Sequence, residues 1–296
     1  MTQADRAPTR HGAGGLALSP VVAGTDVAIG TGFRAIQYRH GDYSERAMSP
    51  FVMVDHFHMT SPTFDVHPHA GMSAVTLMFE DTCGEMKSVD SIGHRSTFGA
   101  GDLHWTLAGR GILHTQLPAD SRSRIHALQI FVNLPEASKS TTPDSFKVAA
   151  ADMPEITKPG LRLRVVAGSL DGSHSPAATP HPILMLDGYL QAIHDPLTIP
   201  LQKNWNAWVL VIDGTLKLDG TITLTAGQTV CVNARTLPTT LTLETDGPSH
   251  FVMLGGPRID EPVIQHGPFV FTNGAAVEQA LRDLKSGRFG QIPDFS

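Results

Sequence analysis

Residues 207–224 read AWVLVIDGTLKLDGTITL, and this stretch decides the predicted fold class. Runs rich in Val, Ile, Leu and Thr are interrupted by two Asp-Gly pairs, Asp213-Gly214 and Asp219-Gly220. Asp-Gly adopts the positive φ angles of tight hairpin turns, and alternating apolar and polar residues are typical of half-buried strands. We therefore expect antiparallel strands here, with a tight hairpin at each Asp-Gly pair.

The same pattern extends through the rest of the chain. Residues 74–79 (AVTLMF), 240–245 (TLTLET) and 250–256 (HFVMLGG) are short strand-like runs bounded by turn residues. Many short strands with frequent turns favour β-sandwiches or barrels over a parallel sheet with crossover helices. The sequence therefore predicts an all-β fold.

One helix is expected close to the C-terminus, near residues 275–286 (AAVEQALRDLKS). Apolar residues recur there at helical spacing, a capping residue precedes them and a glycine follows them. Asn273 is the predicted cap and Gly287 the predicted stop. The predicted apolar face consists of Val277, Ala280, Leu281 and Leu284.

The chain of 296 residues is long enough for two domains. A polar, proline-containing stretch at residues 136–160 separates two strand-rich regions, and we expect the boundary there. The resulting division is a flexible N-terminal tail at 1–20, a first β-domain at 21–145 and a second at 146–296, which ends in the helix.

Composition excludes several classes of protein. With 22 basic and 28 acidic residues the net charge is −6, which argues against direct binding of nucleic acid. No run approaches the roughly 20 apolar residues of a membrane helix, and the first residues lack the apolar segment of a secretory signal. Cys83 and Cys231 are far apart in sequence and are expected to be reduced thiols. We expect a cytoplasmic protein that does not contact a membrane.

Two pairs of polar residues have the spacing of metal ligands on strands. His67 and His69 flank Pro68, and His114 and Gln116 repeat the same i, i+2 spacing. Such residues project from one face of an extended chain. On neighbouring strands, the two pairs would place three imidazole nitrogens and one amide oxygen around a cation. This donor set suits iron, nickel, copper, manganese or zinc.

Ordinary strand chemistry explains these pairs equally well, because the chain has 15 histidines. His56 and His58 have the same spacing but no second pair nearby in sequence, so we rank them below His67 and His69 and expect a structural role for His56. Strand alternation places Trp105 and His104 on opposite faces. If the apolar face is interior, His104 points away from the site. At most it would then contact a ligand side chain and not the metal itself.

The chain also resembles the pirin family over residues 33–293, with gaps. The resemblance rests on six motifs: SPFVMVDHF (49–57), HPHAGMSAVTLMFE (67–80), GAGDLHWTLAGRGILHTQLP (99–118), LQIFVNLP (128–135), EPVIQHGPFVFT (261–272) and SGRFGQI (286–292). It implies a bicupin: two β-sandwich (jelly-roll, cupin) domains with a short C-terminal helix and one metal, often iron, in the N-terminal domain. The implied ligands are His67, His69, His114 and the residue at position 116.

This sequence departs from the family pattern at that fourth ligand. Pirins have glutamate in a GIxHxE motif, whereas this chain has Gln116. Around it, HPHAGMS replaces the more usual HPHRGFE, and His104 replaces a usual glutamine. Three imidazoles and an amide leave the +2 charge of the ion uncompensated, which weakens metal binding and favours Fe(II) over Fe(III).

The resemblance implies an enzyme similar to quercetin 2,3-dioxygenase, acting on a small phenolic or enolic substrate with one divalent metal. Fe(II) is expected, with Ni, Cu, Mn and Zn as alternatives. The ligand carboxylate would take the substrate proton, which Gln116 cannot do, and loss of a general base costs about a hundredfold to ten-thousandfold in rate. Whether the chain is an enzyme therefore stays open, and no catalytic residue is assigned. The alternatives are a non-enzymatic iron-binding regulator that binds a transcription factor or a metabolic enzyme, and a protein whose site binds no metal.

Overall fold

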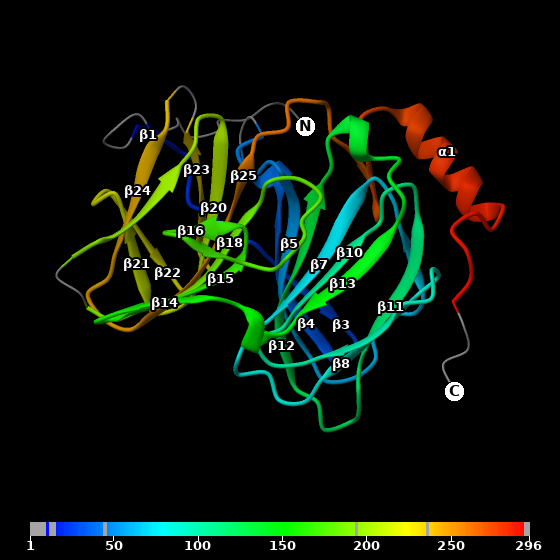
Figure 1. Ribbon diagram of the computed structural model, residues 1–296, viewed down its shortest axis with the longest axis horizontal. Coiled ribbons are helices and arrows are strands. Elements are labelled where there is room, and N and C mark those ends of the chain that lie inside the picture. The colour runs from blue at the N-terminus through cyan, green and yellow to red at the C-terminus, as the bar shows by residue number, and fades with distance from the viewer. Residues whose placement is uncertain (1–9, 12–15, 44–45, 193–194, 235–236, 293–296) are drawn as a thin grey trace. The chain divides into compact units, whose positions relative to one another are not determined.

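A computed structural model describes residues 10–11, 16–43, 46–192, 195–234 and 237–292 (Figure 1). The described chain is built mainly of antiparallel strands with one α-helix, so the predicted all-β fold class is confirmed. It divides into two compact units. Unit 1 comprises residues 1–25, 38–50 and 152–258, and unit 2 comprises residues 26–37, 51–151 and 259–296.

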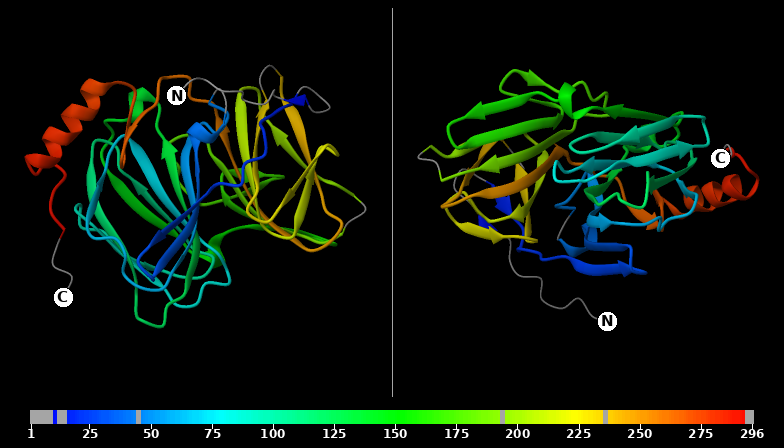
Figure 2. Two further views of the ribbon diagram at one scale, coloured as in Figure 1. Left: turned by 180° about the vertical axis from the view of Figure 1, so that it is seen from behind. Right: turned by 90° about the horizontal axis from the view of Figure 1, so that it is seen from below.

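Unit 2 is a sandwich of a seven-stranded and a four-stranded sheet (Figure 2). The larger sheet has the order β13 (Asp144–Val148), β10 (Leu103–Leu107), β7 (Met72–Met78), β12 (Ile125–Asn133), β5 (Phe51–Met59), β4 (Phe33–Arg39) and β3 (Thr25–Ile29). The smaller has the order β6 (His67–His69), β11 (Ile112–Pro118), β8 (Met86–Asp90) and β9 (Arg95–Phe98). The other elements of this part of the chain are a hairpin of β26 (Ile264–His266) and β27 (Phe269–Phe271), the helix α1 (Gly274–Lys285), and the 3-10 turns η2 (Glu136–Ser138) and η3 (Ala150–Asp152).

Unit 1 has the same kind of architecture. Its eight-stranded sheet has the order β1 (Arg10–His11), β2 (Ala17–Leu18), β23 (Thr229–Ala234), β20 (Trp205–Asp213), β25 (Ser249–Pro257), β18 (Leu184–Leu190), β15 (Leu161–Ala167) and β14 (Glu155–Lys158). The four-stranded sheet has the order β19 (Leu197–Leu201), β24 (Thr239–Glu244), β21 (Thr215–Leu218) and β22 (Ile222–Thr225). The remaining elements are the hairpin of β16 (Ser169–Leu170) and β17 (Ser173–His174), and the 3-10 turn η1 (His40–Asp42).

The two Asp-Gly pairs form different turns. Asp219 and Gly220 both have positive φ, at 46° and 62°, and connect β21 to its antiparallel partner β22 as predicted. The prediction of a second hairpin at Asp213-Gly214 is wrong, because β20 and β21 belong to different sheets. Gly214 has a φ of 78°, and a Cβ there would lie 2.1 Å from the carbonyl oxygen of Pro248. The glycine therefore allows the chain to pass from one sheet to the other.

The C-terminal helix forms where the sequence places it. The Asn273 side chain accepts a hydrogen bond from the backbone N–H of Ala276, so the predicted cap is confirmed. Val277 and Ala280 are buried, with Ala280 in a cluster that also contains Phe269 of β27. Leu281 is 39 % exposed, so the predicted apolar face is one residue too wide.

The predicted domain ranges 21–145 and 146–296 stay a prediction. Each of the two compact units is built from three separate segments of the chain and not from one continuous range. Residues 136–160 contain two strands, β13 and β14, which join different sheets on either side of the change of unit at Ala151 and Asp152. Much of the predicted tail at 1–20 lies outside the described residues. Within its described part, Leu16 and Leu18 belong to the core of unit 1, because β2 pairs with β23.

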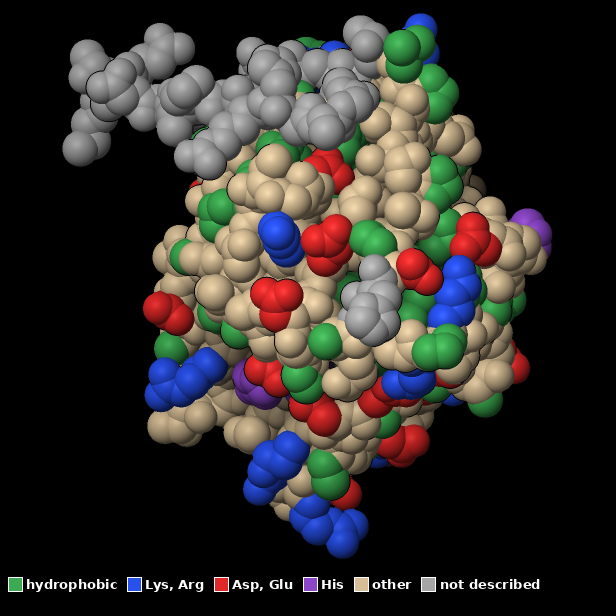
Figure 3. Space-filling view, turned by 90° about the vertical axis from the view of Figure 1, so that its left-hand side faces the viewer, with side chains coloured by type: hydrophobic (Ala, Val, Ile, Leu, Met, Phe, Trp, Pro, Cys, Tyr) green, Lys and Arg blue, Asp and Glu red, His purple; other side chains and the backbone are tan. Residues whose placement is uncertain are grey.

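Charges of both signs are interspersed on the face shown in Figure 3, where Lys and Arg side chains lie between Asp and Glu side chains. Cys83 is exposed, Cys231 is buried, and both are free thiols. Among the described residues, no helix is long and apolar enough to cross a membrane.

Lys139 is a buried cation in unit 2. Its ammonium group donates to the backbone oxygens of Gly71 (2.9 Å) and Val270 (3.0 Å) and to Asn133 Oδ1 (2.6 Å). The residue is 3 % exposed, and burial lowers the pKa of its ammonium group from 10.5 to about 8. These bonds tie together the loop that follows β6, the end of β12 and β27.

This lysine predicts a pH dependence of stability. Between about pH 8 and pH 10.5 the unfolded chain keeps a proton on Lys139 that the folded chain has lost. The unfolded state then binds more protons, so the free energy of unfolding rises with pH across this window, by up to about 3 kcal/mol from this group. We expect urea unfolding to show this rise in the native chain and not in Lys139→Met. Parallel pH profiles for the two proteins would contradict it.

Candidate metal centre

Two neighbouring strands of unit 2 bring three histidines together. In the four-stranded sheet β6 pairs with β11 in antiparallel register, with His114 opposite His67 and Ile112 opposite His69. One ring nitrogen from each of His67, His69 and His114 lies within 4.8 Å of the others. The alternation of strand residues predicted that each pair projects from one face of its strand, and the pairing of β6 with β11 brings the histidines of the two pairs together.

The ring orientations have the form of metal ligands. His67 Nδ1 lies 2.8 Å from the carbonyl oxygen of Asp65, so the N–H of this nitrogen donates to it and the lone pair of Nε2 faces His114. His67 Nε2 and His114 Nε2 are 3.0 Å apart. Metal–nitrogen bonds of about 2.0–2.1 Å at right angles also place neighbouring nitrogens about 3 Å apart. A backbone carbonyl behind an imidazole is a common way of holding a ligand histidine.

All three imidazoles are neutral at pH 7, as ligands must be. Burial is the main cause: it lowers the pKa of His69 to about 3, that of His114 well below its ordinary value, and that of His67 in the same direction. The neighbouring imidazoles lower the pKa of His69 and His114 further. Among the described residues, no carboxylate contributes to the pKa shifts of these three histidines. The cluster therefore offers nitrogen donors without a compensating negative charge.

Gln116 is two residues from His114 on β11, so both side chains project from one face of the strand, and neighbours hold both ends of its amide group. Its Oε1 accepts a hydrogen bond from the Thr76 hydroxyl at 2.9 Å, and its Nε2 lies 3.0 Å from His104 Nδ1. The side chain is buried. A carbonyl oxygen has two lone pairs, so the bond from Thr76 leaves one available for a cation.

The expectation that His104 points away from the site is wrong. His104 is buried on the face that contacts Gln116, whereas Trp105 packs on the other face, stacked on Phe146 at 5.9 Å. Both faces of β10 are buried, so apolar character does not identify the face toward the site. Burial lowers the pKa of His104 to about 4, so this imidazole is also neutral at pH 7.

Sequence reasoning missed the polar row to which His104 belongs. Thr76 lies opposite His104 on β7, and Gln129 lies opposite Thr76 on β12. The Thr76 hydroxyl contacts Gln129 Oε1 at 3.0 Å as well as Gln116. A polar residue recurring in otherwise apolar strands is the signal that could have found this row.

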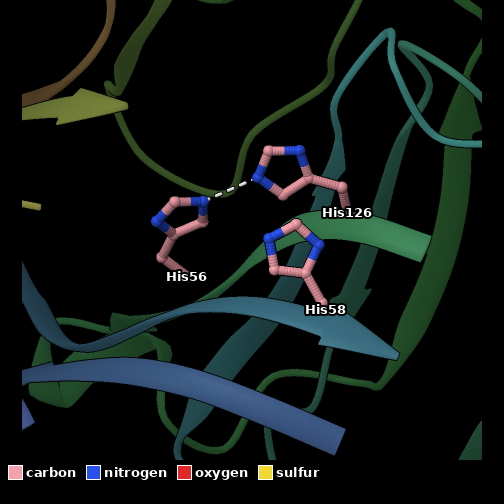
Figure 4. A group of neighbouring side chains, drawn as sticks. All are labelled: His56, His58 and His126. Carbon is pink, nitrogen blue, oxygen red and sulfur yellow. Dashed lines mark hydrogen bonds between the residues drawn. The ribbon is translucent and has the colours of Figure 1, made fainter. Parts of the chain in front are cut away.

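A second histidine cluster lies elsewhere in unit 2. His56 and His58 on β5 meet His126 on β12, and one ring nitrogen of each lies within 4.8 Å of the others (Figure 4). The i, i+2 spacing singled out His56 and His58 but not His126, because 68 residues separate His126 from His58 and only strand pairing brings them together.

Comparison with known proteins agrees with this fold. The family model "Pirin" matches residues 32–132, and "Pirin C-terminal cupin domain" matches residues 185–290. The chain belongs to the pirin family. Pirin of Mus musculus is 33% identical over 257 residues, covering 82% of this chain and 83% of that protein. Pirin-1 of Arabidopsis thaliana is 31% identical over 251 residues, covering 83% and 85%.

Solved structures have the same fold. This pirin resembles a quercetin 2,3-dioxygenase from Acinetobacter baumannii with a TM-score of 0.80 and 26% identity, covering 97% of this chain and all of that one (100%). A bacterial pirin from Escherichia coli in complex with nickel(II) has a TM-score of 0.61 at 17% identity, covering 82% and 100%, and supports the fold alone. The predicted bicupin architecture is confirmed.

The residues present in this pirin fit a divalent transition metal. Three neutral imidazoles converge, one of them oriented by the Asp65 carbonyl group, and Gln116 offers an amide oxygen from the same strand as His114, two residues away. Such nitrogen and oxygen donors are borderline in hardness and suit first-row metals rather than Ca²⁺ or Mg²⁺.

Proposed function

We propose that this pirin is a metal-dependent dioxygenase of the quercetin 2,3-dioxygenase type, with a small phenolic or enolic substrate. One divalent metal, Fe(II) in our proposal, would be held by His67, His69, His114 and the amide oxygen of Gln116. The convergence of three neutral imidazoles on one point carries the proposal. The likeness to a quercetin 2,3-dioxygenase over nearly the whole chain supports the reaction type.

The metal would supply Lewis acidity and a place where substrate and molecular oxygen meet. The chain's own contribution is orientation: the Asp65 carbonyl group holds the ring of His67, while Thr76 and His104 hold the amide of Gln116. None of these groups is a carboxylate, and the amide of Gln116 cannot accept a proton near neutral pH. We therefore expect slow turnover.

Metal content tests the binding part of this proposal. We expect the purified, untagged chain to contain about one equivalent of transition metal more than His67→Ala, which should lose that equivalent during purification because one of its few donors is gone. His67 is only partly buried, so the alanine variant should fold. The exposed His174 provides a matched control, since His174→Ala should retain the metal. Elemental analysis of the three proteins measures this, and equal metal content in all of them would refute the assignment.

Anaerobic loading with each candidate metal, followed by oxygen uptake with quercetin, tests the reaction. Oxygen consumption that depends on both metal and quercetin is the expected result. A chain that binds metal but consumes no oxygen, even with a glutamate at position 116, would instead fit the alternative role of a metal-dependent binding protein. A stable protein partner recovered from native lysate would then support that role.

A further inference from the structure

The second histidine cluster, formed by His56, His58 and His126, is separate from the candidate metal centre. On β12, Gln129 belongs to the polar row beside Gln116, and His126 is three residues away, so the two side chains point to opposite faces of the sheet. On β5, the same parity separates Asp55, which lies opposite Gln129, from His56. The cluster therefore lies on the other face of the seven-stranded sheet from the polar row.

Strand register places the three imidazoles together. His126 lies directly opposite His58, and His56 is two residues from His58 on the same face. His56 Nε2 and His126 Nε2 are 2.7 Å apart, and the rings of His58 and His126 stack at 4.2 Å between centroids. Figure 4 shows the three rings grouped side by side. His58 is exposed and the other two are partly exposed, so ions in solution can reach the cluster.

A carboxylate orients one of these rings. Both carboxylate oxygens of Asp81 lie 2.8 Å from His126 Nδ1. The neutral ring of His126 therefore carries its N–H on Nδ1, which leaves the lone pair of Nε2 toward His56. A carboxylate behind a ligand imidazole is the usual arrangement at zinc sites, where it fixes the tautomer and makes the ring a better donor. The backbone of His126 is also fixed, since its N–H donates to Thr82 Oγ1 and its carbonyl oxygen accepts from the same hydroxyl group.

The spacing of the His56 and His126 nitrogens is close to that of a metal site. Tetrahedral bonds of about 2.0–2.1 Å place two ligand nitrogens about 3.3 Å apart, so the 2.7 Å pair needs to open by less than about 1 Å. Burial and the neighbouring His126 lower the pKa of His58, which keeps this imidazole neutral at pH 7. Three imidazoles leave a fourth position for water, as in open zinc sites.

We propose that His56, His58 and His126 form a second transition-metal site, a surface-accessible three-histidine Zn²⁺ site in which Asp81 orients His126. Its ligands lie on other strands than those of the candidate metal centre and on the other face of the seven-stranded sheet from the polar row. It also has a carboxylate behind one of its ligands. Its occupancy is independent of the proposed dioxygenase function.

Zn²⁺ binding to the full chain tests this site. Equilibrium dialysis followed by elemental analysis should show that His58→Ala loses one equivalent of Zn²⁺ that both the native chain and His67→Ala bind. Asp81→Asn keeps all three imidazoles. We expect it to lower the affinity for this Zn²⁺ ion by about 10–100-fold, as loss of such an orienting partner usually does. The exposed His266 provides a matched control, because His266→Ala removes a histidine on another strand and should change nothing.

Equal Zn²⁺ binding by the native chain and His58→Ala would overturn the proposal. So would unchanged affinity in Asp81→Asn, or a loss in His266→Ala equal to that in His58→Ala, which would indicate scattered surface histidines. Imidazole ¹⁵N chemical shifts of the native chain give a second measurement that needs no variant. Without metal, we expect the shifts to show the His126 tautomer with its proton on Nδ1. On addition of Zn²⁺, we expect the ¹⁵N chemical shift of one nitrogen in each of the three rings to change. Unshifted His126 nitrogens at saturating Zn²⁺ would also overturn it.

Discussion

Replacing Gln116 by glutamate is expected to raise quercetin-dependent oxygen consumption of the metal-loaded protein by about a hundredfold to ten-thousandfold. The substitution changes the amide to a carboxylate of nearly the same shape, next to three imidazoles that have no compensating negative charge. The carboxylate supplies the missing proton acceptor and lowers the net charge of the site from +2 to +1, which should also tighten metal binding.

The surroundings of Gln116 can accept this change. Thr76 already donates to the oxygen at this position and would donate to a carboxylate in the same way. His104 faces the amide nitrogen through Nδ1, so it must move its proton to Nδ1 in order to donate to the new carboxylate. The double variant His104→Gln with Gln116→Glu avoids this tautomer change, because the glutamine amide N–H donates directly. We expect it to be at least as active as Gln116→Glu alone.

Gln116→Met is the matched control for this experiment. It keeps the volume but has neither a hard oxygen ligand nor a base, so it should lose metal and stay inactive. Steady-state oxygen uptake, with metal content measured on each sample, separates an effect on chemistry from an effect on occupancy. If the native chain is already as fast as Gln116→Glu, position 116 does not hold the base. If neither protein turns over quercetin with any metal, the proposed function is wrong.

The shared face of His67 and His69, and that of His114 and Gln116, could be predicted from sequence because each depends only on local geometry. Residues two apart on a strand share a face, and both pairs are on strands. The family resemblance then located the partner of each pair. Local rules also predicted the Asn273 cap and the hairpin at Asp219-Gly220, since each depends on a few adjacent residues.

The features that sequence reasoning missed depend on pairing between distant strands. His126 joins His56 and His58 through the register of β5 and β12, and Thr76 meets Gln116 across 40 residues. The face of His104 was misjudged for a different reason. Alternation identifies the interior only when one face is in water, and β10 is buried on both. The hairpin expected at Asp213-Gly214 was wrong because a turn motif does not say to which sheet the next strand belongs.

The largest stability effect is expected at Asp187, in unit 1. Its carboxylate is 0 % exposed and lies 2.8 Å from Arg164 Nη1 and 2.7 Å from His250 Nε2. Asp187→Ala removes the carboxylate from a guanidinium group that is itself only 1 % exposed. Loss of one partner of a buried ion pair commonly costs about 3–5 kcal/mol, because the remaining charge stays in a medium that solvates it poorly. Urea unfolding at pH 7 measures the change in free energy of unfolding.

A second ion pair on the same sheet provides the control. Arg162, two residues before Arg164 on β15, pairs with Glu155 on β14, with Nη2 and Oε1 2.8 Å apart. This distance equals that of the buried pair, but the two side chains are 35 % and 40 % exposed, so water solvates whichever charge remains. Glu155→Ala should therefore cost at most about 1 kcal/mol. Similar losses in Asp187→Ala and Glu155→Ala would show that burial is not what makes the first pair important.

The joint replacement of Arg164 and Asp187 by apolar residues distinguishes the cost of an uncompensated charge from the value of the pair itself. Suppose that the cost of about 3–5 kcal/mol comes from leaving the guanidinium buried without a carboxylate. The double variant Arg164→Met with Asp187→Leu removes both charges, so it should recover much of the stability that Asp187→Ala loses. Apolar residues of similar volume often replace a buried ion pair without net cost. His250 limits the recovery, because its Nε2 also loses the Asp187 carboxylate. A double variant no more stable than Asp187→Ala would mean that the pair contributes attraction of its own, beyond avoiding a buried charge.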